Sequence, residues 1–242
     1  MELEIIKANI VDVAADAIVL PANTKLKEGS GTSTAIFKAA GRKQLTQACK
    51  KLGSCEVGSA VPTLAYDLDA EFIIHAVVPK WIDGEHDEYN LLSSAYLSSL
   101  ELADMMGCTS IAFPLIASGN NGYDPELAFQ IAKENIDLFK GNNLTKAILV
   151  IYGDSTAVMI RKAGYSYSLL PEDAEKRKIQ LEHRKKQKQL FEEGVEVAQQ
   201  LLEEQLQKGI DYLKVPKNRQ KLFDDAVKIA GAAFLTVKAR KI

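Results

Sequence analysis

The stretch AIVLPANTKLKEGSGTSTAIFKAAG, residues 17–41, places a glycine-rich turn between a short apolar run and a helical pattern. The stretch IAFPLIASGNNGYDPELAF, residues 111–129, repeats the same order of strand, turn and helix start. Such a turn leaves backbone N–H groups of the helix N-terminus free for an anion, and glycine lets a phosphate oxygen approach the main chain. Either turn alone is also typical of an ordinary connection. Two of them after strands of one sheet indicate a ligand with two adjacent phosphates.

Neither turn carries a known nucleotide fingerprint. No Gly-Lys-Ser/Thr follows either turn, so neither is a P-loop, and neither reads GxGxxG. The phosphate interpretation therefore depends on the position of the turns and not on a short motif.

The sequence up to about residue 170 alternates short apolar runs with longer helical patterns, which predicts an α/β domain with a mostly parallel sheet covered by helices. Asp124-Pro125-Glu126 is a clear helix start, with an acidic N-cap and proline at the first helical position. The expected strands are residues 3–8, 17–20, 60–64, 72–77, 110–114 and 147–152. The expected helices are residues 34–52, 89–106, 125–139 and 156–163.

Composition and charge divide the 242 residues into two parts. The chain is 47% hydrophobic and 26% charged, as in ordinary globular proteins, and its formal net charge is −2. Residues before Pro171 carry 14 basic and 20 acidic side chains, whereas the remainder carries 16 basic and 12 acidic ones. We therefore expect a domain over residues 1–168 and a helical extension over residues 169–242.

The expected extension combines a basic run with an apolar stripe. Residues 176–188 hold seven basic residues and one acid, which is typical of a solvated helix face. Phe191, Val195, Ala198, Leu202 and Leu206 recur at the spacing of one helix face. This stripe either packs against the domain or forms a seam with a partner or a second copy of the chain.

Several chemistries are not expected. The three cysteines form neither a disulfide framework nor a metal knuckle, which favours a reduced, cytoplasmic setting without a bound metal. His75 lies within an apolar run and is interpreted as a core histidine. The N-terminus resembles neither a signal peptide nor a membrane span, and the net charge argues against nucleic acid as the main partner.

Several segments in register resemble the macrodomain family. ADAIVLPAN at residues 15–23 and AIFKAAG ending at Gly41 are similar to the family's first motif. CEVGSAV at residues 55–61, FIIHAVVPKW at residues 72–81 and IAFPLIASGNNGY at residues 111–123 follow in the family's order. The resemblance covers residues 1–165 and implies a three-layer α/β/α fold that binds ADP-ribose at the carboxyl edge of a mixed, mostly parallel sheet. It implies no cofactor.

The resemblance also implies which residues hold the ligand. Asn23 would contact the distal ribose and is the candidate catalytic residue. The first loop would follow this ribose and one phosphate with Gly29, Ser30, Gly31, Thr32 and Ser33. The second loop would wrap the diphosphate with Ser118, Gly119, Asn120, Asn121, Gly122 and Tyr123. Tyr152 would stack on adenine, and Asn9 with Ile10 would contact the edge of the adenine ring. The alternative for Tyr152 is an ordinary aromatic residue at a strand end, and the alternative for Asn9 is a residue that closes a turn.

The departures from the family pattern favour binding over hydrolysis. Asn9 stands where the family usually has Asp, and Leu20 and Pro21 replace the first half of an NAAN motif. Glu28 replaces a glycine and brings a carboxylate near the phosphates. Ser33 occupies the place of an acid found in hydrolytic members, and a hydroxyl cannot orient or deprotonate water as a carboxylate does. Asn121 replaces an aromatic residue beside the distal ribose.

Three functions follow from these observations. The first is a module that binds ADP-ribose, a related nucleotide or an ADP-ribosylated protein. The second is an ADP-ribosyl hydrolase or O-acyl-ADP-ribose deacylase, which without the acid would be slow. The third is a degenerate scaffold whose C-terminal helices hold a partner.

Overall fold

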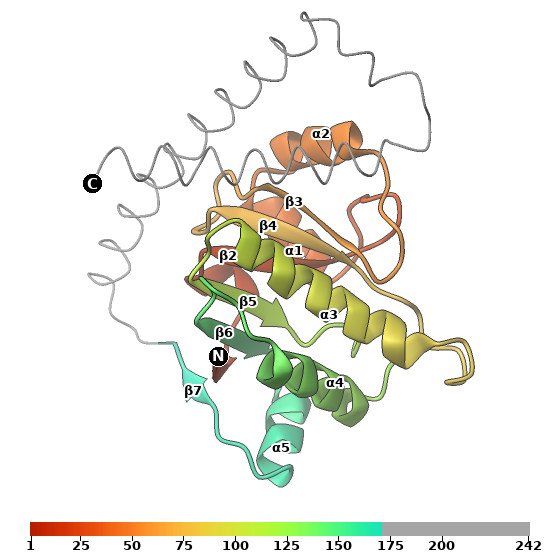
Figure 1. Cartoon of the computed structure of the whole chain (residues 1–242), viewed down its shortest axis with the longest axis vertical. Coiled ribbons are helices and arrows are strands. Elements are labelled where there is room, and N and C mark those ends of the chain that lie inside the picture. Colours follow the sequence, from red (N-terminus) through yellow and green to blue (C-terminus); the bar gives the residue numbers. More distant parts are fainter. Residues whose placement is uncertain (171–242) are drawn as a thin grey trace, which may run out of the picture.

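The structure of the protein is a computed structural model, in which residues 1–170 are described. Its centre is a seven-stranded sheet in the order β3-β4-β2-β5-β6-β1-β7 (Figure 1). All neighbouring strands are parallel except β3 and β4, which confirms the mixed, mostly parallel sheet. The strands are β1 (Glu2–Lys7), β2 (Ala17–Ala22), β3 (Ala60–Leu64), β4 (Phe72–Val77), β5 (Ser110–Pro114), β6 (Lys146–Ile151) and β7 (Ser168–Leu169).

Helices cover both faces of the sheet and make the three layers. Ile18 and Leu20 of β2 pack into the cluster that holds the buried side chains of α1 and α2. Ala17 and Val19 of the same strand point to the opposite face, into the cluster that α3, α4 and α5 complete. The helices are α1 (Thr32–Ala39), α2 (Arg42–Leu52), α3 (Glu88–Met105), α4 (Pro125–Leu138) and α5 (Asp154–Lys162), with a short 3-10 turn η1 (Ile10–Asp12).

The single helix expected over residues 34–52 is wrong. Two helices, α1 and α2, meet at Gly41, whose φ of +88° lies in the left-handed region. Glycine adopts this backbone conformation without strain, whereas an added Cβ would also displace the ends of the Gln44 and Asp67 side chains. Helical periodicity continues across this corner because both helices face the same side of the sheet.

Several other bounds differ from expectation by one or two residues, and one strand was not expected. The strand β2 continues through Pro21 to Ala22, and β7 was not expected because it has only two residues. β7 pairs with β1 and spans the expected boundary at residue 168. Residues 171–242 of the expected extension, with the basic run and the apolar stripe, lie outside the described residues. No helix within residues 1–170 is long and apolar enough to cross a membrane.

Candidate functional site

A cavity of about 340 Å³ opens at the carboxyl ends of β2 and β5. These strands are parallel neighbours, so the first loop (residues 23–31) and the second loop (residues 115–124) leave the sheet at the same edge. The lining residues are Pro21, Ala22, Asn23, Gly29, Ser30, Gly31, Thr32, Ser33, Val78, Lys80, Pro114, Leu115, Ala117, Gly119, Asn120 and Asn121.

The side chain of Asn23 holds the start of the first loop. Its Nδ2 donates a hydrogen bond to the carbonyl oxygen of Lys27 at 2.7 Å, and its Oδ1 accepts from the backbone N–H groups of Lys25 and Lys27, each at 3.2 Å. The amide therefore shapes the loop, while the second N–H of Nδ2, which takes part in none of these bonds, can donate to a ribose.

Two hydroxyl groups of α1 are hydrogen-bonded to the backbone of Gly29. The Oγ of Ser33 accepts a hydrogen bond from the N–H of Gly29 at 3.0 Å, and the Oγ1 of Thr34 donates to the carbonyl oxygen of Gly29 at 2.6 Å. Ser33 is buried, whereas Gly31, the N-cap of α1, offers no side chain to the helix terminus. The first N–H groups of α1 therefore lie beside a cavity without a capping side chain, which suits an anion.

The carboxylate of Glu28 is paired with Arg42. The Nε and an Nη of Arg42 donate to the two carboxylate oxygens of Glu28, each at 2.8 Å, and Glu28 does not line the cavity. This bidentate pair compensates the charge that Glu28 brings to the loop.

The second loop is a tight turn with an open side. The N–H of Gly122 donates to the carbonyl oxygen of Gly119 at 2.9 Å, and Ala117 and Gly122 have positive φ values of +69° and +79°. A Cβ added to Gly119 would meet no heavy atom within 4 Å. The backbone at Gly119 is therefore accessible from the cavity.

The two loops contact each other, and a third segment is bonded to the end of β2 and to the second loop. Nδ2 of Asn120 donates to Oγ of Ser30 and joins the loops directly. In the segment of residues 78–81, the N–H of Val78 donates to the carbonyl oxygen of Ala22 at 3.3 Å, and the N–H of Trp81 donates to that of Asn121 at 2.8 Å.

Nine of the fifteen predicted site residues line this cavity: Asn23, Gly29, Ser30, Gly31, Thr32, Ser33, Gly119, Asn120 and Asn121. Ser118 and Gly122 lie in the second loop but outside the lining, and Oγ of Ser118 donates to the carbonyl oxygen of Leu115 at 2.9 Å. Tyr123 is 3% exposed, and its hydroxyl donates to the carbonyl oxygen of Glu88 at 2.8 Å. The side chain of Tyr123 therefore supports the second loop from the core.

The three residues expected near adenine lie at another part of the same edge. Asn9 and Tyr152 follow the neighbouring parallel strands β1 and β6, outside the lining of the cavity. Tyr152 is 78% exposed, whereas Ile10 is buried. The Oδ1 of Asn9 accepts from the N–H of Val11 at 3.4 Å and caps η1.

Lys80, by contrast, lines the cavity and was not among the predicted site residues. The only signal was its place in FIIHAVVPKW, directly after a strand expected in the same sheet. Sequence reasoning missed it because no periodicity shows where residues 78–81 turn after β4.

One group of acidic and histidine side chains has the composition of a metal site, but one of its carboxylates is already hydrogen-bonded to the backbone. Ligand atoms of Asp83, His86 and Glu88 lie within 4.8 Å of one another. The carboxylate of Glu88 accepts N–H groups from Ile82, Asp83, Gly84 and His86. Burial raises the pKa of Glu88, but these donors outweigh it and lower the pKa to about 2. Glu88 thus closes the turn before α3.

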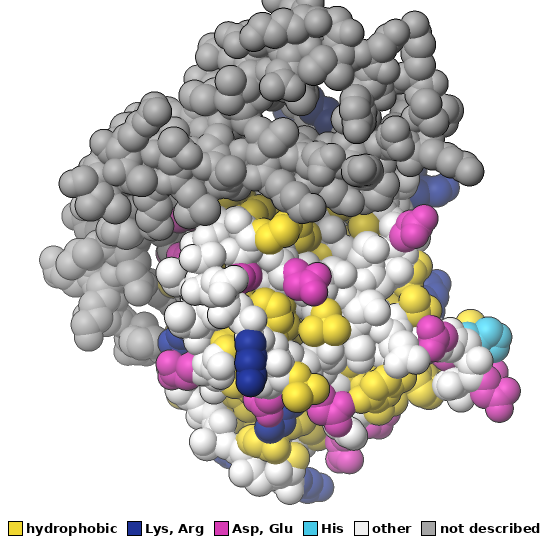
Figure 2. All heavy atoms as spheres, viewed as in Figure 1, with side chains coloured by type: hydrophobic (Ala, Val, Ile, Leu, Met, Phe, Trp, Pro, Cys, Tyr) yellow, Lys and Arg dark blue, Asp and Glu magenta, His cyan; other side chains and the backbone are white. Residues whose placement is uncertain are grey.

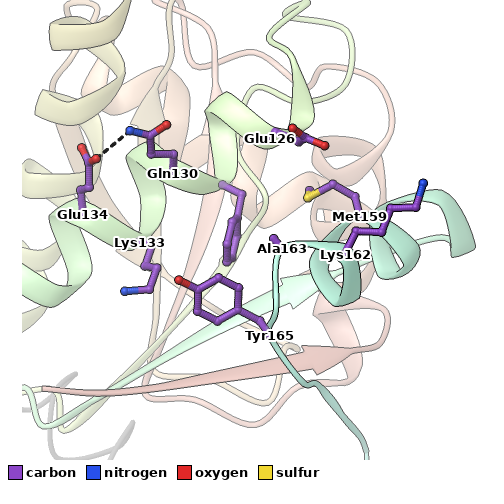
Figure 3. A pocket seen from close by; sticks show the side chains of 9 residues that line it. Glu126, Gln130, Lys133, Glu134, Met159, Lys162, Ala163 and Tyr165 are labelled. Carbon is purple, nitrogen blue, oxygen red and sulfur yellow. Dashed lines mark hydrogen bonds between the residues drawn. The ribbon is translucent and has the colours of Figure 1, made fainter.

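A second hollow, of about 480 Å³, lies between α4 and α5 (Figure 3). Tyr165 packs edge-on against Phe129 at 5.1 Å between ring centroids, and Gln130 donates to Glu134 at 2.9 Å. Lys133 is paired with Asp137. No glycine-containing strand-to-helix turn faces this hollow among the described residues, and its lining carries both charge signs, so it offers no anion site comparable with the first cavity.

Comparison with known proteins finds relatives of this chain. The model of the macro domain family matches residues 19–132. A macro domain-containing protein of Caldanaerobacter subterraneus subsp. tengcongensis is 41% identical over 166 residues, which cover 67% of this chain and 95% of that protein. The O-acetyl-ADP-ribose deacetylase of Escherichia fergusonii is 43% identical over 141 residues, 57% of this chain and 79% of that protein.

Solved structures share the fold. The Oceanobacillus iheyensis macrodomain with ADP aligns with a TM-score of 0.62 at 30% identity, over 66% of this chain and 88% of that chain. The Trypanosoma brucei macrodomain in complex with ADP aligns with a TM-score of 0.61 at 27% identity, over 67% of this chain and 69% of that chain.

Proposed function

We propose that this chain, which belongs to the macro domain family, binds ADP-ribose or a related adenine nucleotide in the cavity between its two loops. The observation that carries the proposal is the pair of glycine-containing loops at the ends of adjacent parallel strands, held together by Asn120 and Ser30. Structural relatives with ADP and a relative named O-acetyl-ADP-ribose deacetylase support the same class of ligand.

The ligand would cross the edge of the sheet from the cavity toward β6 and β1. The N-terminus of α1 and the backbone near Gly119 would hold the diphosphate, because N–H groups and glycine are the features that bind phosphate without steric conflict. The distal ribose would lie near Asn23 and Asn121. Adenine would lie near Tyr152 and Asn9, where an exposed aromatic ring offers a stacking surface.

Hydrolysis of an ADP-ribosyl or acyl group is the second candidate, favoured by the relative named as a deacetylase. The chain lacks the acid expected beside the first loop, and the hydroxyl of Ser33 already accepts the N–H of Gly29. Loss of a positioned general base removes roughly 10²–10⁴-fold of rate. We therefore infer that the chain binds ADP-ribose, or an ADP-ribosylated protein as a larger ligand, and that it hydrolyses the ADP-ribosyl or acyl bond only slowly.

Calorimetric titration with ADP-ribose tests this function directly. The parent chain should bind, and Gly119→Glu should abolish binding because it adds bulk and negative charge where the phosphates approach. Gly119→Ala is the matched control and should retain most of the affinity, since a Cβ there has open space. Equal binding by the parent and Gly119→Glu would contradict the proposed site.

A further inference from the structure

Lys80 lies between the two loops at the rim of the cavity. Its neighbours in the chain are fixed, because Val78 is bonded to Ala22 beside the first loop and Trp81 is bonded to Asn121 of the second. Lys80 is exposed and also lines the cavity, so its ammonium group is accessible from the ligand and from solvent.

No acidic side chain competes for this ammonium group within the cavity. The lining contains no Asp or Glu, and no ion pair joins Lys80 to another of residues 1–170. The carboxylate of Glu28 in the first loop lies outside the lining and is paired with Arg42. Lys80 is also the one basic residue among those that line the cavity, since Lys25 and Lys27 of the first loop are exposed outside the lining.

The position of Lys80 corresponds to the far end of the proposed ligand. The segment of Lys80 is hydrogen-bonded to Ala22, which precedes Asn23, and to Asn121. The proposed function places Asn23 and Asn121 around the distal ribose. In an ADP-ribosylated protein, the modified side chain leaves from this ribose. The polypeptide that carries the modification would therefore emerge next to Lys80.

We propose that Lys80 recognises acidic side chains that flank the modified residue, so that the preferred ligand is an ADP-ribosylated acidic peptide. This inference rests on the proposed function, since the nucleotide must first occupy the cavity. The attraction between an exposed ammonium group and a carboxylate is modest and decreases with salt. It therefore determines a preference among modified proteins and leaves the nucleotide as the main source of affinity.

The test uses the full chain and two synthetic mono-ADP-ribosylated peptides that differ only in flanking glutamate or glutamine. At low salt the parent should bind the glutamate peptide about fivefold more tightly than the glutamine peptide. Lys80→Met should bring this ratio close to one, and Lys80→Glu should invert it. The matched control Lys43→Met removes an exposed lysine of α2 outside the cavity and should keep the parental ratio.

Binding of free ADP-ribose distinguishes a failure of the proposed function from a failure of the role of Lys80. If the parent does not bind free ADP-ribose, the proposed function fails. If the parent binds it but treats the two peptides alike, only the role of Lys80 fails. A loss of affinity in Lys80→Met that is equal for both peptides would also overturn the inference, because Lys80 would then contact the nucleotide itself.

Discussion

At the scale of single residues, the polar side chains around the first loop bind its backbone. Asn23 holds the backbone of Lys25 and Lys27, and Ser33 with Thr34 holds the peptide of Gly29. A loop fixed in this way loses little conformational freedom when a ligand binds, which favours affinity. The same bonds leave Ser33 without a free role as a base.

Ser33→Asp should raise the release of ADP-ribose from a mono-ADP-ribosylated protein. A carboxylate at this position can still accept the N–H of Gly29 and adds an acceptor that orients water. The expected gain is part of the roughly 10²–10⁴-fold that a positioned base supplies. Rapid release by the parent that Asn23→Ala abolishes would contradict the slow-turnover interpretation.

His75 makes the stability of the fold depend on pH. Its Nε2 lies 2.9 Å from Oγ1 of Thr63, its Nδ1 has no hydrogen-bond partner among residues 1–170, and burial lowers its pKa from 6.5 to about 4. The folded state prefers the neutral ring while the unfolded chain takes up a proton below pH 6.5. The contribution of neutral His75 to the free energy of unfolding should therefore be fully present above pH 6.5. The free energy of unfolding should fall by roughly 3 kcal/mol as the pH decreases to 4.

Denaturant titrations of the parent and His75→Gln between pH 7 and pH 4.5 check this dependence. This window lies above the range in which Glu88, with its lowered pKa, loses its contribution. The pKa of His86 is raised by its hydrogen bond to Asp83, so its small contribution has the opposite sign and is the same in both proteins. Equal pH dependence in the two proteins would exclude His75 as the cause.

At the scale of elements, α2 controls the charge of the first loop through one ion pair. Arg42 opens α2 directly after the corner at Gly41, and its guanidinium group reaches back to Glu28. The corner that divides α1 from α2 thus places a cation beside the loop.

Arg42→Ala should weaken the binding of ADP-ribose by a few-fold, because the unpaired carboxylate of Glu28 would then repel the phosphates. The double variant Glu28→Gln, Arg42→Ala should restore the parental affinity, and Lys43→Ala should leave it unchanged. Calorimetry on the four proteins gives the comparison. An Arg42→Ala protein with full affinity would show that Glu28 lies too far from the ligand to matter.

At the scale of the whole molecule, the sequence predicted the sheet and its two loops because these features are local. An apolar run, a glycine turn and an N-cap such as Asp124 are each contained in a few neighbouring residues. The corner at Gly41, the strand β7 and the role of Lys80 depend on contacts between distant segments, including Asp67 against Ala40 and Trp81 against Asn121. Periodicity within one segment cannot show such contacts.

The surface over α3 and α4 has a mixed composition. On the face that α3 and α4 cover, apolar side chains lie in small groups between polar and acidic ones (Figure 2). The visible part of this face carries no single broad apolar area of the kind that marks a protein interface.

Backbone amide NMR of the full chain measures where ADP-ribose binds. On titration, the largest shifts should occur at the amides of Gly29, Gly31, Gly119 and Gly122, with smaller ones near Tyr152. The amides that line the hollow between α4 and α5 should stay unchanged. Shifts concentrated around that hollow, or none at the two loops, would contradict the account.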